Sequence, residues 1–122
     1  MKVIILGGCG GMGRYASKMI SSYNQIQLFT IADLHKDDAE KFAKELGTHV
    51  NGIGLDINDK ENLYETLKDF DVVLNTVGPF FRYGYEVLKT SLDANCHYMD
   101  ICDDWEPTEK MLELDLSLIH IS

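Results

Sequence analysis

Two patterns of hydrophobic residues, one typical of strands and one of helices, alternate along this chain. Short apolar runs are typical of β-strands, and between them apolar residues recur at the three- and four-residue spacing of amphipathic helices. The runs that predict strands are residues 3–6, 27–32, 49–55, 71–75 and 97–101. Strict alternation of strands and helices with short connections predicts a parallel sheet with helices on both faces.

The helices carry start and stop signals. Asp37 with Glu40, and Asn58 with Glu61, are spaced as capping pairs at the beginnings of the second and third helices. Gly47 is placed to end the second helix. Later helices are predicted at residues 85–94 and, as a beginning only, 109–114. The apolar positions predicted to face the sheet are Met12, Tyr15, Ala16, Met19, Ile20, Tyr23, Ala39, Phe42, Ala43, Leu46, Leu63, Leu67, Phe70, Val87, Leu88 and Leu92.

These elements predict a three-layer α/β/α domain with a doubly wound parallel sheet of the Rossmann type. We expect about five strands in the order 3-2-1-4-5. Residues 1–115 are assigned to this domain, which we expect to be incomplete at its C-terminal end. Residues 116–122 differ in sequence character from the preceding residues and are interpreted as the product of a truncation or a sequence artefact.

The composition excludes some classes of binding partner. The 122 residues carry a formal net charge of −9, which argues against nucleic acid and anionic membrane surfaces, because both attract basic patches. The sequence has no apolar run near the ~18 residues of a membrane span and no signal-peptide pattern, so we expect a cytoplasmic protein. Cys9, Cys96 and Cys102 lack disulfide spacing, and we predict buried thiols and no metal site.

Five glycines lie within seven positions directly after the first strand. The segment Gly8-Cys9-Gly10-Gly11-Met12-Gly13 matches G-x-G-x-x-G between a predicted strand and a predicted helix, the context that dinucleotide binding requires. In this reading Gly8 allows a tight turn, Gly10 lets a pyrophosphate approach the backbone, and Gly13 lets the helix pack closely. The residues predicted to bind the cofactor here are Gly8, Gly10, Gly11, Met12 and Gly13.

Charged residues flank this segment. Arg14 either adds positive charge at the phosphates or points to solvent. Asp33 lies twenty residues after Gly13, at the end of the second predicted strand. A carboxylate there accepts hydrogen bonds from the ribose hydroxyls of an adenosine and repels a 2′-phosphate, although His35 and Lys36 offset that repulsion. We therefore expect NAD or NADP as the cofactor, with a preference for NAD; the alternative is that Asp33 only begins a turn.

Two further strand ends are candidates. Asp56 is placed to bond the adenine amino group, directly or through the backbone of Ile57, or else it starts the next helix together with Asn58. The segment after the fourth strand lies at the edge of the sheet where ligands bind, and we predict that its backbone contacts the cofactor. Loop geometry alone is the alternative. The residues of that segment are Val77, Gly78 and Pro79.

Three stretches, GGCGGMGRYA, VGPFFRYG and HYMDI, resemble the cofactor-binding domain of the saccharopine dehydrogenase and reductase family. The resemblance covers about residues 1–114, and VGPFFRYG is its most specific part. It implies NAD(P)-dependent oxidoreduction at the C–N bond of a secondary amine that joins amino-acid moieties. It also implies a second domain that binds this small amino-acid-derived substrate. We find no such domain in the 122 residues and expect the chain alone not to turn over.

The sequence names no catalytic residue. A proton acceptor and cationic groups for the substrate carboxylates are required, and no constellation supplies them. Arg82, expected in the loop after Pro79, is interpreted as solvent-exposed, and His97 as a packed core residue. A module that senses NAD(P) and regulates a partner without catalysis is the alternative function. A flavin-binding domain uses the same glycine pattern, and a homodimer is left open.

Overall fold

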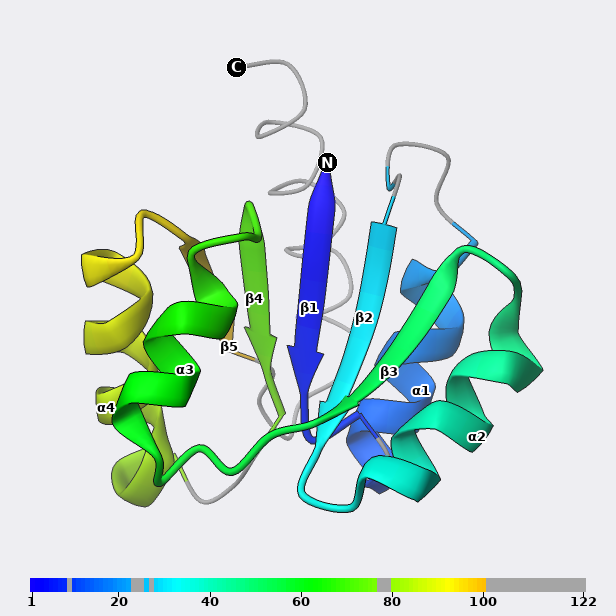
Figure 1. The fold of residues 1–122 in the computed structure, drawn as a ribbon, viewed down its shortest axis with the longest axis horizontal. Coiled ribbons are helices and arrows are strands. Elements are labelled where there is room, and N and C mark those ends of the chain that lie inside the picture. The colour runs from blue at the N-terminus through cyan, green and yellow to red at the C-terminus, as the bar shows by residue number, and fades with distance from the viewer. Residues whose placement is uncertain (9, 23–25, 27, 77–79, 101–122) are drawn as a thin grey trace.

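A computed structural model of the chain describes residues 1–8, 10–22, 26, 28–76 and 80–100. Within them one parallel sheet has the strand order β3-β2-β1-β4-β5, which confirms the predicted topology (Figure 1). The strands are β1 (Lys2–Leu6), β2 (Leu28–Asp33), β3 (Val50–Gly54), β4 (Val72–Asn75) and β5 (His97–Asp100). The helices are α1 (Gly11–Ile20), α2 (Lys36–Leu46), α3 (Lys60–Leu67) and α4 (Phe80–Asp93). None of these helices is long and apolar enough to cross a bilayer.

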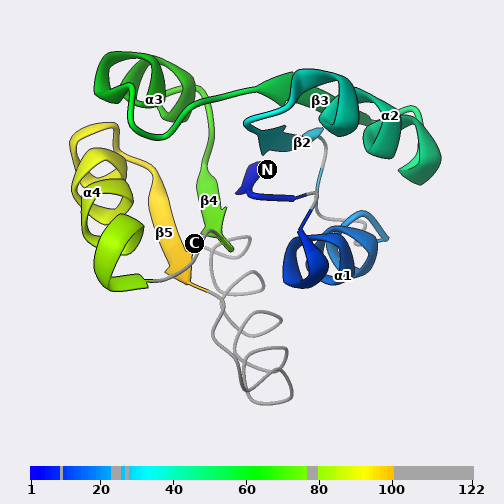
Figure 2. The same cartoon turned by 90° about the horizontal axis from the view of Figure 1, so that it is seen from below.

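Helices cover both faces of the sheet, with α1 and α2 on one face and α3 and α4 on the other (Figures 1 and 2). The central strand β1 supplies both cores. Val3 and Ile5 pack with residues of α1 and α2, whereas Ile4 and Leu6 pack with residues of α3 and α4. All four side chains are buried. Burial on both faces explains why β1 is a continuous apolar run and not an alternating one.

The inward face of α1 differs from the prediction. Tyr15 was expected to face the sheet, but it is 54% exposed. The buried residues of this helix include Gly13, Ala16 and Ser17, and of these Gly13 and Ser17 lie almost opposite Tyr15 because each residue turns the helix by about 100°. Small residues face the sheet here because the helix lies close to the backbone that leaves β1. The same error affects Leu92 of α4, which is 67% exposed.

The start of α2 also differs. It begins at Lys36 after the N-cap residue His35, and not at the predicted pair of Asp37 and Glu40. Asp37 lies inside the first turn, where its negative charge interacts favourably with the positive end of the helix dipole but does not cap the helix. The end of α2 is as predicted: Gly47 follows the last helical residue with a φ of +146°.

The start of α3 is shifted by one residue. Asp59, and not Asn58, is the N-cap, and its carboxylate accepts a hydrogen bond from the Asn62 N–H at 3.2 Å. Asn58 is held one step earlier, because its own N–H donates to Asp56 Oδ1 at 2.9 Å. The turn from β3 to α3 is therefore built from two successive carboxylate bonds.

The helix α4 begins at Phe80, five residues before the predicted start. Arg82 consequently belongs to the helix and not to a loop. The predicted helix at residues 109–114 lies outside the described residues, as do Tyr23, Cys9 and Cys102.

Candidate functional site

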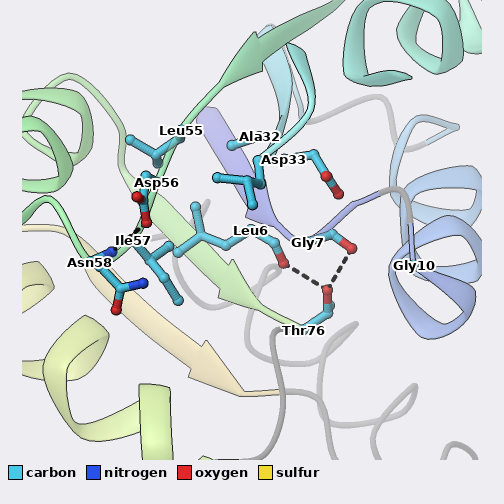
Figure 3. Close-up of a pocket in the computed structure, with 11 residues that line it drawn as sticks. Leu6, Gly7, Gly10, Ala32, Asp33, Leu55, Asp56, Ile57, Asn58 and Thr76 are labelled. Atoms are coloured by element: carbon cyan, nitrogen blue, oxygen red, sulfur yellow. Dashed lines mark hydrogen bonds between the residues drawn. The ribbon is translucent and has the colours of Figure 1, made fainter. Parts of the chain in front are cut away.

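A pocket of about 340 Å³ opens at the carboxyl ends of the central strands (Figure 3). It spans the point where the strand order reverses between β1 and β4, which is where open α/β sheets bind ligands. Its volume lies within the range of small-molecule and cofactor sites. The described residues that line it are Leu6, Gly7, Gly10, Ala32, Asp33, Leu34, Leu55, Asp56, Ile57, Asn58 and Thr76.

The turn that leaves β1 is made by Gly7, a residue that the sequence analysis did not single out. Gly7 has a φ of +77°, which glycine adopts without strain, and its N–H donates to the Ala32 carbonyl of β2 at 2.8 Å. Gly8 lies in the same turn, but the positive φ is at Gly7 and not at Gly8. Gly8 is needed for close approach, since a Cβ there would lie 2.5 Å from Ile31 Cγ2.

Gly13 and Gly10 differ in what surrounds them. A Cβ on Gly13 would run into the Gly7 carbonyl and lie 2.8 Å from the Cα of Gly8, so α1 packs on the turn as closely as predicted. A Cβ on Gly10 would meet only the Gly7 carbonyl oxygen, at an ordinary 3.5 Å. The fold requires a glycine at position 13, whereas at position 10 a glycine leaves space in the pocket.

The N-terminus of α1 has no cap from its own side chains. Gly10 is the N-cap residue, Gly11 and Met12 begin the helix, and the first turn contains no acidic residue. The first amides of a helix have no partner within it, and the helix dipole makes this end positive. Arg14 is exposed and is not among the described residues that line the pocket, and its guanidinium lies over the Phe42 ring of α2, 4.4 Å from the centroid.

Asp33 and Asp56 line the same pocket from neighbouring strands (Figure 3). The Leu55 N–H donates to the Asp33 carbonyl at 2.9 Å, which holds the ends of β2 and β3 together. Asp33 is half-buried and its Oδ1 accepts from the His35 N–H at 3.3 Å. Asp56 lines the pocket, and its carboxylate also accepts a hydrogen bond from the Asn58 N–H in the turn that precedes α3. Among the described lining residues these two carboxylates are the only charged side chains.

The structure thus brings together four predicted residues: Gly10, Asp33, Asp56 and Ile57. It adds Leu34, which is 64% exposed, and Thr76. A large apolar residue directly after a candidate ribose carboxylate was a usable signal for Leu34. Thr76 gave none, because its role depends on a contact with residues far away in the sequence. Val77, Gly78 and Pro79 lie outside the described residues.

Other candidate residues do not join this pocket. His97, predicted to be packed in the core, is exposed on β5. Cys96 is buried as predicted, and burial raises the pKa of its thiol to about 12, so it carries no thiolate near neutral pH. In the described part of the chain, no three His, Cys, Asp or Glu side chains are grouped to hold a metal ion.

The glycine turn, the uncapped α1 and the acidic ends of β2 and β3 define a dinucleotide-binding domain of the Rossmann type. Residues 3–116 match the model of the family described as "Saccharopine dehydrogenase NADP binding domain". The chain belongs to this family.

Individual relatives agree with the family match. The chain is 29% identical over 124 residues to the mouse "Saccharopine dehydrogenase-like oxidoreductase", covering 89% of this chain and 29% of that protein. It is 24% identical over 118 residues to a Caenorhabditis elegans "Lipid droplet localized protein", covering 89% and 28%. The fold is similar to apo saccharopine dehydrogenase (L-Glu forming) from Saccharomyces cerevisiae, with a TM-score of 0.72 and 21% identity over 90% of this chain and 23% of that one. The chain spans less than a third of these relatives.

Proposed function

We propose that this chain holds the dinucleotide of an oxidoreductase of the saccharopine dehydrogenase type. In this proposal the pyrophosphate lies against the backbone of the glycine turn and the first turn of α1. The adenosine ribose bonds to Asp33, and the adenine packs between the apolar side chains of Leu34 and Ile57 beside Asp56.

One observation carries the proposal. Gly10, which is the N-cap residue of α1 and has no side-chain cap, and Asp33 both line a single pocket. Anions bind at helix N-termini because the amides and the dipole attract them, and a ribose hydroxyl is a good donor to a carboxylate. An adenosine diphosphate matches these groups, because its pyrophosphate suits the helix N-terminus and its ribose hydroxyls suit the carboxylate.

We further propose that NAD is preferred over NADP. A 2′-phosphate on the ribose would meet the carboxylate of Asp33, with no cationic side chain among the described residues that line the pocket. Lys36 follows on α2, but its ammonium lies 3.7 Å from Glu40 and is largely exposed. Exposed ion pairs of this kind are weak, so Lys36 is the cation available to bind the 2′-phosphate of NADP.

The reaction proposed is oxidoreduction at the C–N bond of a secondary amine that joins amino-acid moieties. The nicotinamide, when bound, supplies the hydride chemistry, and the protein supplies position and electrostatics. The role of this chain is then to hold the adenosine diphosphate half of the cofactor, so that the nicotinamide is presented at the β1–β4 crevice. The groups that bind the substrate are proposed to belong to a second domain.

Calorimetric titration with NAD and with NADP tests the binding proposal. We expect saturable binding of both dinucleotides, with a higher affinity for NAD. In Gly10→Val the affinity should fall by about 100-fold or more (about 2.7 kcal/mol), since the valine side chain would fill the phosphate space. The far-UV circular dichroism of Gly10→Val should match the parent, because a Cβ meets no close neighbour there. Equal affinity of parent and variant would remove the pyrophosphate from this turn.

A turnover assay separates the enzyme from the sensing alternative. Formation of reduced cofactor from NAD and a secondary amine bearing two carboxylates, in the protein that carries the substrate-binding domain, supports the enzyme. Dinucleotide binding with no turnover of any such amine supports a module that senses the cofactor and regulates a partner.

A further inference from the structure

The hydroxyl of Thr76 reaches from the end of β4 to the backbone that leaves β1. Thr76 Oγ1 donates to the Leu6 carbonyl at 2.6 Å and lies 3.1 Å from the Gly7 carbonyl oxygen (Figure 3). The Thr76 N–H also donates to the Leu6 carbonyl, at 3.1 Å. Thr76 lines the pocket and is half-buried. One side chain therefore fixes two successive peptide groups at the start of the glycine turn.

The orientation of these peptides matters for an anionic ligand. A carbonyl oxygen repels a phosphate oxygen, so a phosphate-binding turn must present its N–H groups to the ligand and keep its C=O groups occupied elsewhere. Between Gly7 and Gly8 the peptide lacks side chains on both sides, so sterics alone do little to prevent it from rotating.

The bonds made within and beside the turn hold this peptide only in part. The Gly10 N–H donates to the Gly7 carbonyl at 3.1 Å, and the Gly8 N–H reaches the Ala32 carbonyl at 3.4 Å, which is long for such a bond. The hydroxyl of Thr76 adds a contact to the Gly7 carbonyl from a separate strand. Because a hydroxyl has one proton, the two contacts form a three-centre hydrogen bond, in which the shorter contact with the Leu6 carbonyl is the stronger one.

We propose that Thr76 is a positioning residue for dinucleotide binding. Its hydroxyl holds the Leu6 and Gly7 carbonyls and so keeps the glycine turn in the orientation that accepts a pyrophosphate. This inference rests on the proposed function, and it assigns the effect to the phosphate part of the ligand alone.

Thr76→Val and Thr76→Ser test the proposal in the 122-residue chain, with ADP-ribose and adenosine as probes followed by NMR titration. Valine keeps the shape and removes the hydroxyl, and we expect it to weaken ADP-ribose about tenfold (~1.4 kcal/mol). Adenosine has no phosphate, so its affinity should stay unchanged. Serine keeps the hydroxyl and should bind ADP-ribose within about twofold of the parent (~0.4 kcal/mol).

Thr90→Val is the matched control. Thr90 Oγ1 donates to the Glu86 carbonyl at 2.8 Å within α4, so the variant loses a comparable bond away from the pocket. It should bind both probes as the parent does.

Three outcomes would overturn the assignment of Thr76: unchanged ADP-ribose affinity in Thr76→Val, an equal loss for both probes, or failure of Thr76→Ser to restore binding. If Thr76→Val does not fold, Thr76→Ala replaces it; unfolding of both, with Thr76→Ser folded, would show a purely structural role and also overturn the proposal. A parent chain that binds no ADP-ribose would overturn the proposed function itself.

Discussion

Two turns at the same edge of the sheet lead from a strand into a helix, and they are built in opposite ways. The turn from β3 to α3 satisfies itself: Asp56 accepts from Asn58 and Asp59 accepts from Asn62, so the helix is capped by its own carboxylate. The turn from β1 to α1 uses glycine, has no side-chain cap and has no acid in the first helical turn.

The difference separates what the fold needs from what a ligand needs. A helix start with its own carboxylate has little use for an external anion, whereas an uncapped start beside a pocket leaves amide donors for one. Both turns follow the carboxyl end of a strand in one parallel sheet and both contribute residues to the pocket, and they differ in the residues that build them. Substitutions in each turn test whether the glycine turn divides into structural and ligand-facing positions.

The largest effect is expected from Gly13→Ala. The new Cβ would run into the backbone of Gly7 and Gly8, which can shift only if α1 moves away from the sheet. Overpacking of this kind costs typically 1–3 kcal/mol and here, against backbone, about 3 kcal/mol or more. Urea denaturation followed by circular dichroism measures it.

Gly8→Ala and Gly10→Ala complete a graded series. In Gly8→Ala the Cβ meets a side-chain methyl of the buried Ile31 and not backbone, so the loss should be smaller than for Gly13→Ala. In Gly10→Ala the free energy of unfolding should change by less than about 1 kcal/mol, since no close contact forms. A Gly10 variant as unstable as the Gly13 variant would contradict the division of the turn.

Asp33→Ala is expected to have the next effect, on ligand affinity. Loss of a charged acceptor at the ribose should weaken NAD about tenfold (~1.4 kcal/mol). NADP should weaken less, because the same substitution removes a repulsive charge near its 2′-phosphate. The measured quantity is the ratio of the two dissociation constants by calorimetry.

Asp37→Ala is the control for that experiment, because it removes one carboxylate from the first turn of α2 at a position that is not among the described lining residues. The ratio should stay at the parent value in this variant. A ratio that is unchanged in Asp33→Ala as well would remove Asp33 from the ribose site.

The two turns also show what sequence reasoning reaches. The strand order, the edge that carries the pocket and the placement of Asp33 and Asp56 followed from apolar periods and motif spacing. Spacing did not show that Gly7 rather than Gly8 has the positive φ, because adjacent glycines are equivalent in a pattern. Nor did it reveal Thr76, whose contact joins residues seventy positions apart. Ser17 is fully buried but polar, so a pattern of apolar positions does not include it.

The smallest effect concerns the self-capped turn. Asp59→Ala removes the carboxylate that accepts from Asn62, and loss of an N-cap costs typically ~1 kcal/mol. The free energy of unfolding should fall by about that amount while dinucleotide affinity stays at the parent value, because Asp59 does not line the pocket among the described residues. Asn58→Ala is the control, since its side chain does not cap the helix and only its backbone N–H is used in the turn. If Asn58→Ala proved more destabilising than Asp59→Ala, the N-cap of α3 would be Asn58, the residue that the sequence pattern indicates. The contrast between a β3–α3 turn capped by its own carboxylate and the uncapped glycine turn would then fail.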